Sequence, residues 1–134
     1  MFFFFFVIFV VEGEMELNIL HFNDVYEITE STREPIGGAA RFQALVKKLK
    51  EEHKAIVVFS GDAFSPSVIS SVTGGEHMVP ILNEIGISIA TLGNHDFDFG
   101  LKACKELIDA TNFPWMMANV VDGDGNRFVE GLFG

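Results

Sequence analysis

The chain has 134 residues, one cysteine and a formal net charge of −10, from 9 Lys and Arg against 19 Asp and Glu. This length corresponds to one domain, and 49% hydrophobic residues suffice for a packed core and exclude a disordered chain. No basic run is longer than Lys47-Lys48, so the positive surface needed to bind DNA or RNA is missing. An acidic chain repels a small phosphate ligand unless bound cations reverse the local charge, which directs attention to clustered carboxylates. The single Cys104 excludes an intrachain disulfide.

The chain begins with an unbroken apolar run, residues 2–11. Ten residues are too few for a membrane-spanning helix, which needs about 20. The length fits the core of a secretory signal, but no Lys or Arg precedes the run and no small-x-small cleavage pattern follows it. We therefore expect residues 1–14 to be an apolar leader outside the fold, and residues 15–134 to form the folded part. A cytoplasmic location and secretion through an atypical N-terminal signal both stay open.

Beyond the leader, the hydrophobic pattern alternates between strands and helices. The predicted strands cover residues 17–22, 55–59, 87–92 and 113–121. The apolar positions of the three predicted helices are Phe42, Leu45, Val46 and Leu49; Met78, Ile81, Leu82 and Ile85; and Leu101, Cys104, Leu107 and Ile108. This β-α-β-α-β-α-β order predicts an α/β fold with helices packed on the sheet.

Polar residues that suit metal binding follow three of the predicted strands. They are Asp24, Asp62 and Asn94. Each alone is more typical of a turn or a helix cap, because such side chains accept backbone N–H bonds there. In α/β sheets, however, ligands gather beyond the carboxyl ends of the strands, where the three side chains would converge. Converging carboxylates repel each other unless a cation lies between them, which favours a hard divalent metal ion.

Three motifs carry a resemblance to a known family: LHFNDVY at residues 20–26, GDAFSPS at 61–67 and GNHDFD at 93–98. In this order and spacing they resemble the first three motifs of the calcineurin-like metallophosphoesterases. The branch that they resemble most is that of the 5′-nucleotidases and 2′,3′-cyclic-nucleotide phosphodiesterases. The resemblance covers about residues 16–119 and implies a partial metallophosphoesterase sandwich. It makes residues 15–134 the N-terminal portion of such a domain, truncated before its second half.

The resemblance also implies a site with two divalent metal ions, which are Mn, Zn, Mg or Fe. Asp24 would bind the first ion, Asp62 would bridge both, and Asn94 would bind the second. Residue chemistry agrees, because a carboxylate has two oxygens for two cations, whereas an amide offers one neutral oxygen. Such a pair of ions activates water for attack on phosphorus, so the implied substrate is a nucleotide or another small phosphate ester.

His95 and Asp98 are the expected catalytic pair. The resemblance implies that His95 lies beside the substrate, where it stabilises the transition state or protonates the leaving oxygen. Asp98, three residues later, would accept the other ring N–H and fix the tautomer. The alternative is that both cap a helix. Asp96 is either an anchor behind the site or a cap.

Two departures from the family pattern keep a second function open. The family has a histidine where this chain has Tyr26, and a phenol is a poor ligand for Mg²⁺, Mn²⁺ or Zn²⁺, so Tyr26 is a doubtful ligand. Further histidine ligands come from later motifs of the family, and His21, His53 and His77 are expected to be structural or solvated instead. The chain is therefore either a 5′-nucleotidase-like phosphoric ester hydrolase or a catalytically incompetent fragment or pseudoenzyme that binds one metal weakly or mediates interactions. In isolation we expect it to be weakly active or inactive.

A flavodoxin-like module that binds a phosphate cofactor would have the same order of strands and helices. It is disfavoured because no Gly-rich or hydroxyl-rich phosphate loop follows the first strand directly.

Overall fold

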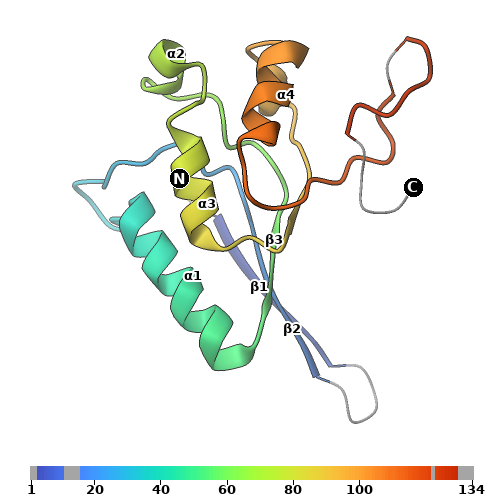
Figure 1. Ribbon diagram of the computed structural model, residues 1–134. Coiled ribbons are helices and arrows are strands. Elements are labelled where there is room, and N and C mark those ends of the chain that lie inside the picture. Colours follow the sequence, from blue (N-terminus) through green and yellow to red (C-terminus); the bar gives the residue numbers. More distant parts are fainter. Residues whose placement is uncertain (1–2, 11–15, 122, 130–134) are drawn as a thin grey trace.

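The computed structural model describes residues 3–10, 16–121 and 123–129, and its central element is a four-stranded sheet (Figure 1). The strands are β1 (Phe3–Val10), β2 (Glu16–Asn23), β3 (Ile56–Phe59) and β4 (Ile89–Ala90), in the order β1-β2-β3-β4. β2, β3 and β4 are parallel, whereas β1 pairs antiparallel with β2. Parallel strands connected through helices confirm the predicted α/β class.

β1 lies within the apolar run that the sequence analysis leaves outside the fold. Its backbone pairs along the whole of β2, from Phe3 opposite Asn23 to Val10 opposite Glu16. Aromatic and β-branched residues favour extended backbone, and an edge strand needs only one neighbour. The structure thus places residues 3–10 in the sheet, where a leader outside the fold was expected. The other residues of that leader lie outside the described part of the chain.

Three helices follow the predicted pattern: α1 (Ala39–His53), α3 (Met78–Ile85) and α4 (Leu101–Asp109). α1 and α3 pack against each other on one face of the sheet (Figure 1). Two predicted core positions are exposed instead, since Leu45 and Leu101 keep 45% and 61% of their surface. None of the described helices is long and apolar enough to cross a membrane. Two short elements that the sequence analysis does not anticipate are α2 (Ser70–Thr73) and the 3-10 helix η1 (His95–Phe97).

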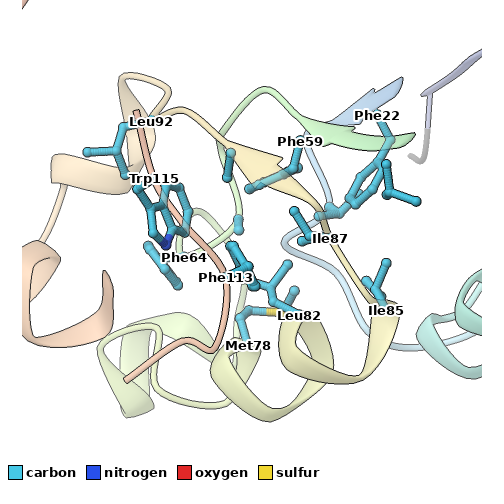
Figure 2. Close-up of a cluster of buried hydrophobic side chains, with 14 of the residues drawn as sticks. Phe22, Phe59, Phe64, Met78, Leu82, Ile85, Ile87, Leu92, Phe113 and Trp115 are labelled. Atoms are coloured by element: carbon cyan, nitrogen blue, oxygen red, sulfur yellow. The ribbon is translucent and has the colours of Figure 1, made fainter. Parts of the chain in front are cut away.

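The core between the sheet and the helices is built around aromatic rings. Phe22 of β2 and Phe59 of β3 are fully buried, with ring centroids 5.0 Å apart. Trp115 extends this group, with centroids 6.0 Å from Phe59 and 5.9 Å from Phe64 (Figure 2). Aromatic pairs at these separations add to the stability gained from burial alone. Because Phe59 and Phe64 anchor both sides of the segment after β3, this segment has a defined position at the edge of the sheet.

The last predicted strand, residues 113–121, joins the sheet through one parallel bridge between Ala90 and Trp115, and its Val121 forms an antiparallel bridge with Arg127 instead. The Ala90 N–H donates to the Pro114 carbonyl at 3.0 Å, and the Met116 N–H donates to the Ala90 carbonyl at 2.7 Å. Pro114 has no N–H of its own, which limits the pairing of this segment. Pairing of the preceding strand is short as well, since β4 has two residues where residues 87–92 are predicted.

Candidate active site

The segments after β2 and β3 lie side by side, joined by backbone hydrogen bonds. The Asp24 N–H donates to the Gly61 carbonyl, and the Val25 N–H donates to the Asp62 carbonyl, each at 3.1 Å. Asp24 and Asp62 both adopt left-handed backbone, with φ of 57° and 62°. Among residues with a side chain, Asp tolerates this conformation better than most, because its short polar side chain bonds locally. The two carboxylates that the sequence singles out therefore come from adjoining turns.

Two glycines allow the segment after β4 to approach these turns. A Cβ on Gly61 would lie 2.0 Å from the Gly93 nitrogen, and a Cβ on Gly93 would lie 2.2 Å from Oδ1 of Asp62. Only glycine leaves room for contact this close. The His95 N–H then donates to Oδ1 of Asp62 at 2.8 Å. Asn94, directly before His95, precedes η1 and makes no side-chain capping bond, so its amide is not committed to that role.

Asp96 holds the turns after β3 and β4 together. Its carboxylate is buried, with 1% of the residue exposed. Oδ1 accepts the Ala63 and Phe64 N–H groups at 2.8 and 3.1 Å, and Oδ2 accepts those of Asp62 and Gly93 at 2.8 and 2.9 Å. Burial raises the pKa of the Asp96 carboxyl, while these four bonds act in the opposite direction. Of the two roles considered for Asp96, the contacts match an anchor behind Asp62.

His95 and Asp98 form a hydrogen-bonded pair, with 2.9 Å between Nδ1 and Oδ2. An ionised carboxylate only accepts, so Nδ1 carries the proton. The hydroxyl of Ser65 donates to the same Oδ2 at 2.8 Å. The bond to Asp98 raises the pKa of His95, and the charges of Asp98, Asp62 and Asp24 add to this shift. The bond from His95, followed by that from Ser65, lowers the pKa of Asp98.

Ser65 is a member of this cluster that sequence reasoning missed. The one sequence signal for Ser65 is its position inside the second motif, three residues after Asp62. A serine in a turn is most often a local hydrogen-bonding residue, so residue type alone does not mark it.

Asp24, Asp62 and Asn94 bring two carboxylates and one amide to this edge of the sheet. Such oxygen donors suit Mg²⁺ and Mn²⁺ and are acceptable to Zn²⁺. The Asn23 side-chain amide donates a hydrogen bond to Oδ2 of Asp24, and Oδ1 of Asp24 takes no part in this bond. Within residues 3–10, 16–121 and 123–129, no group of three His, Cys, Asp or Glu side chains is arranged to hold a metal ion. By their chemistry, the two carboxylates and the amide suit a part of a metal coordination shell.

Two of the remaining histidines each have a ring nitrogen in hydrogen-bond contact with a hydroxyl group. Nε2 of His21 lies 2.6 Å from the Ser60 hydroxyl, and Nδ1 of His77 lies 2.8 Å from the Thr73 hydroxyl. Both contacts agree with the structural role expected for these side chains. Tyr26 is half-buried two residues after Asp24, at the position where the family pattern has a histidine.

A sequence profile described as calcineurin-like phosphoesterase matches residues 17–130. The chain belongs to this family, which uses divalent metal ions. The resemblance found in the three motifs is therefore confirmed.

Individual relatives point to the nucleotidases within this family. The chain is 32% identical over 122 residues to the snake venom 5′-nucleotidase of Gloydius brevicauda, covering 83% of this chain and 21% of that protein. It is 30% identical over 119 residues to the NAD 5′-nucleotidase of Haemophilus influenzae, covering 80% and 20%. The chain thus spans about a fifth of the length of these curated relatives and matches the N-terminal part of them.

Solved structures of nucleotidases have the same fold as this chain over most of its length. The Haemophilus influenzae NAD nucleotidase superposes with a TM-score of 0.70 at 29% identity, over 83% of this chain and 22% of that one. The 5′-nucleotidase precursor of Thermus thermophilus superposes with a TM-score of 0.70 at 26% identity, over 87% and 24%.

Proposed function

We propose that the chain provides the N-terminal part of a 5′-nucleotidase-like active site, which hydrolyses a phosphate ester of a nucleotide at a dinuclear metal centre. The observation that carries the proposal is the junction of the three strand-end turns. There Asp62 is in hydrogen-bond contact with the backbone of His95, and its own backbone accepts the N–H of Val25, next to Asp24. The names of the nucleotidase relatives support the choice of substrate.

Asp24, Asp62 and Asn94 are the residues that would hold the two divalent ions, with Asp62 between them. When bound, ions of this kind lower the pKa of water and neutralise charge on phosphoryl oxygens. The two carboxylates supply the negative charge that retains cations at this edge of the sheet. Bound cations would offset the negative charge of these carboxylates, so the site would no longer repel an anionic substrate, although the chain as a whole has a net charge of −10.

His95 would act on the oxygen that leaves phosphorus. Its Nδ1–H is held by Asp98, so Nε2 is the nitrogen available to the substrate. The bond to Asp98 favours the protonated ring, which can donate from Nε2 to the leaving oxygen. Asp98 does not touch the substrate in this scheme, because its role is to orient the ring.

Tyr26 favours a second candidate function, a weak single-metal site without efficient hydrolysis. The phenol stands at the position of a family histidine ligand and binds Mg²⁺, Mn²⁺ or Zn²⁺ poorly. Under this candidate the chain would bind one metal ion, at Asp62 and Asn94, and would serve in interactions.

Phosphate release from adenosine monophosphate with Mn²⁺ tests the proposal in the chain extended to the full length of a family domain, because the 134 residues alone are expected to be weakly active or inactive. Asp62→Asn and Asn94→Ala are each expected to lower the rate by about a hundredfold or more, because loss of a ligand costs at least as much as loss of its supporting contacts. Asp109→Asn, an exposed position on α4, is the matched control and should leave the rate unchanged. Full activity in both ligand variants would contradict the assignment.

Calorimetric titration with Mn²⁺ separates the two candidates. Two tight equivalents, reduced by Asp62→Asn, support the dinuclear centre. One weak equivalent supports the second candidate.

A further inference from the structure

The Ser65 side chain is a buried polar group next to the His95–Asp98 pair, with 4% of the residue exposed. Its hydroxyl donates to Oδ2 of Asp98 at 2.8 Å, the same atom that accepts Nδ1–H of His95 at 2.9 Å. We propose that Ser65 is a positioning residue for the reaction, which fixes the Asp98 carboxylate and through it the tautomer and direction of the His95 ring. This inference rests on the proposed function for its catalytic consequence, but not for its structural one.

Asp98 needs such a support because it lies at the surface. Its side chain keeps 40% of its surface exposed, and that of His95 keeps 43%. Among the described residues, the carboxylate has only these two side-chain hydrogen-bond partners, and both bind Oδ2. An exposed carboxylate held only by an exposed ring would rotate with it, since surface pairs of this kind gain little over their separate hydration.

Ser65 is itself held rigidly, which makes it a suitable support. The preceding residue, Phe64, is fully buried, and its N–H donates to the buried carboxylate of Asp96. After Ser65, the backbone is fixed by reciprocal bonds between Ser67 and Ser70, at 2.7 and 3.0 Å. The hydroxyl of Ser65 therefore presents a fixed donor to Asp98.

Loss of the Ser65 hydroxyl would lower the reaction rate by changing the direction in which Nε2 of His95 points. With Oδ2 of Asp98 held, the ring keeps its proton on Nδ1 and turns Nε2 toward the substrate side. Without the hydroxyl, the carboxylate can rotate into solvent, and the ring samples other directions and the other tautomer. Protonation of a leaving oxygen contributes a factor of about 10² to 10⁴ to the reaction rate. A misoriented His95 ring should lose a part of this contribution, which lowers kcat about tenfold.

The experiment compares Ser65→Ala, Ser65→Thr and Ser88→Ala in the full chain. Ser65→Thr keeps the hydroxyl donor. Ser88→Ala is the control, because it removes a half-buried hydroxyl that accepts the Val57 N–H near the start of β3 and has no bond to Asp98 or to the segment of Ser65. Ser65→Cys, close in shape but a weak donor, replaces Ser65→Ala if that variant does not fold.

The first readout is independent of activity: ¹⁵N NMR of the His95 ring in the metal-free protein, above the pH at which the ring is protonated. We expect the native protein, Ser65→Thr and Ser88→Ala to show the proton on Nδ1, and Ser65→Ala to show a mixture with the Nε2–H form. The same tautomer ratio in Ser65→Ala and in Ser88→Ala would overturn the proposal.

The second readout, made in the chain extended to the full length of a family domain, uses two substrates that differ in their need for a proton. For adenosine monophosphate, whose leaving group is an alkoxide, Ser65→Ala should lower kcat about tenfold with KM within about twofold. For 4-nitrophenyl phosphate, whose leaving group departs without a proton, kcat should fall less than about threefold. Equal losses on both substrates would overturn the positioning role. If the extended protein hydrolyses neither substrate, the proposed function fails, and the NMR measurement alone decides the role of Ser65.

Discussion

Replacing Asp96 by Asn tests how the turns of the active site are held together. In the native protein, two N–H groups donate to each oxygen of the Asp96 carboxylate. An Asn side chain keeps one oxygen but turns the other into an NH₂ donor, so two backbone donors lose their acceptor and face another donor. Each unsatisfied buried donor costs about 1–3 kcal/mol, and the two surviving bonds lose charge assistance, which gives a total loss of about 3–5 kcal/mol.

Thermal and urea unfolding, followed by circular dichroism, measure this loss of stability. For a chain of this length, the Tm should fall by about 10–20 °C. Asp109→Asn removes the same charge from an exposed site on α4 and should change the free energy of unfolding by no more than about 0.5 kcal/mol. If Asp96→Asn stays within about 1 kcal/mol of the native protein, the carboxylate does not hold the turns and other contacts must do so.

Three further predictions concern single side chains. Gly61→Ala should destabilise the protein by more than about 3 kcal/mol, because its Cβ would lie 2.0 Å from the Gly93 nitrogen. Gly100 has the same φ of 89° but nothing within 4 Å of an added Cβ, so Gly100→Ala should cost only about 1–2 kcal/mol. Equal losses of stability in urea unfolding would refute the close approach of the two turns. Burial lowers the pKa of His77, with the Glu27 charge opposing, so the unfolded state binds more protons between the folded pKa and about 6.5, and stability should fall as pH drops through that window. His77→Gln should remove that part of the slope in urea unfolding, and an unchanged slope would contradict it. Burial raises the pKa of the Cys104 thiol to about 12, so iodoacetamide at mildly alkaline pH should label the native protein at least about a hundredfold more slowly than the urea-unfolded chain, and comparable rates would show that the thiol is accessible.

The fold class and the helices could be predicted because periodicity reports burial along one element. In α1, α3 and α4, the repeat of apolar residues identifies buried positions such as Val46, Leu82 and Cys104. The same repeat overestimates burial at the margins: Leu101 begins α4 and stays exposed, and Leu45 lies at the edge of the stripe. The repeat of apolar residues along one helix does not reveal which other segments, if any, cover the ends of that helix.

Strand pairing was harder to predict, since it depends on a partner segment. The apolar composition of residues 3–10 fits an edge strand as well as a leader, and only the antiparallel pairing with β2 distinguishes them. Residues 113–121 have the composition of a strand, but pairing with β4 is limited to Trp115.

Residue types and spacing name the candidate site residues, but they do not reveal the contacts that support them. The motifs place Asp62 and Asn94 after consecutive parallel strands. The contacts of Asp96 and Ser65 join segments more than 30 residues apart, as shown by the sequence separations of 34 for the Asp62 N–H to Asp96 bond and 33 for the Ser65 to Asp98 bond. Such side chains look like ordinary turn residues until the tertiary structure pairs them.

The central claim is that Asp24, Asp62 and Asn94 hold the metal ions together. Anomalous diffraction from crystals of the purified protein grown with Mn²⁺ tests it most directly, since the manganese signal locates each ion. The account predicts two peaks, both within about 2.5 Å of Asp62 oxygens, with Asp24 beside one and the Asn94 amide oxygen beside the other. Manganese bound elsewhere in the chain, with Asp62 and Asn94 free of it, would contradict the claim.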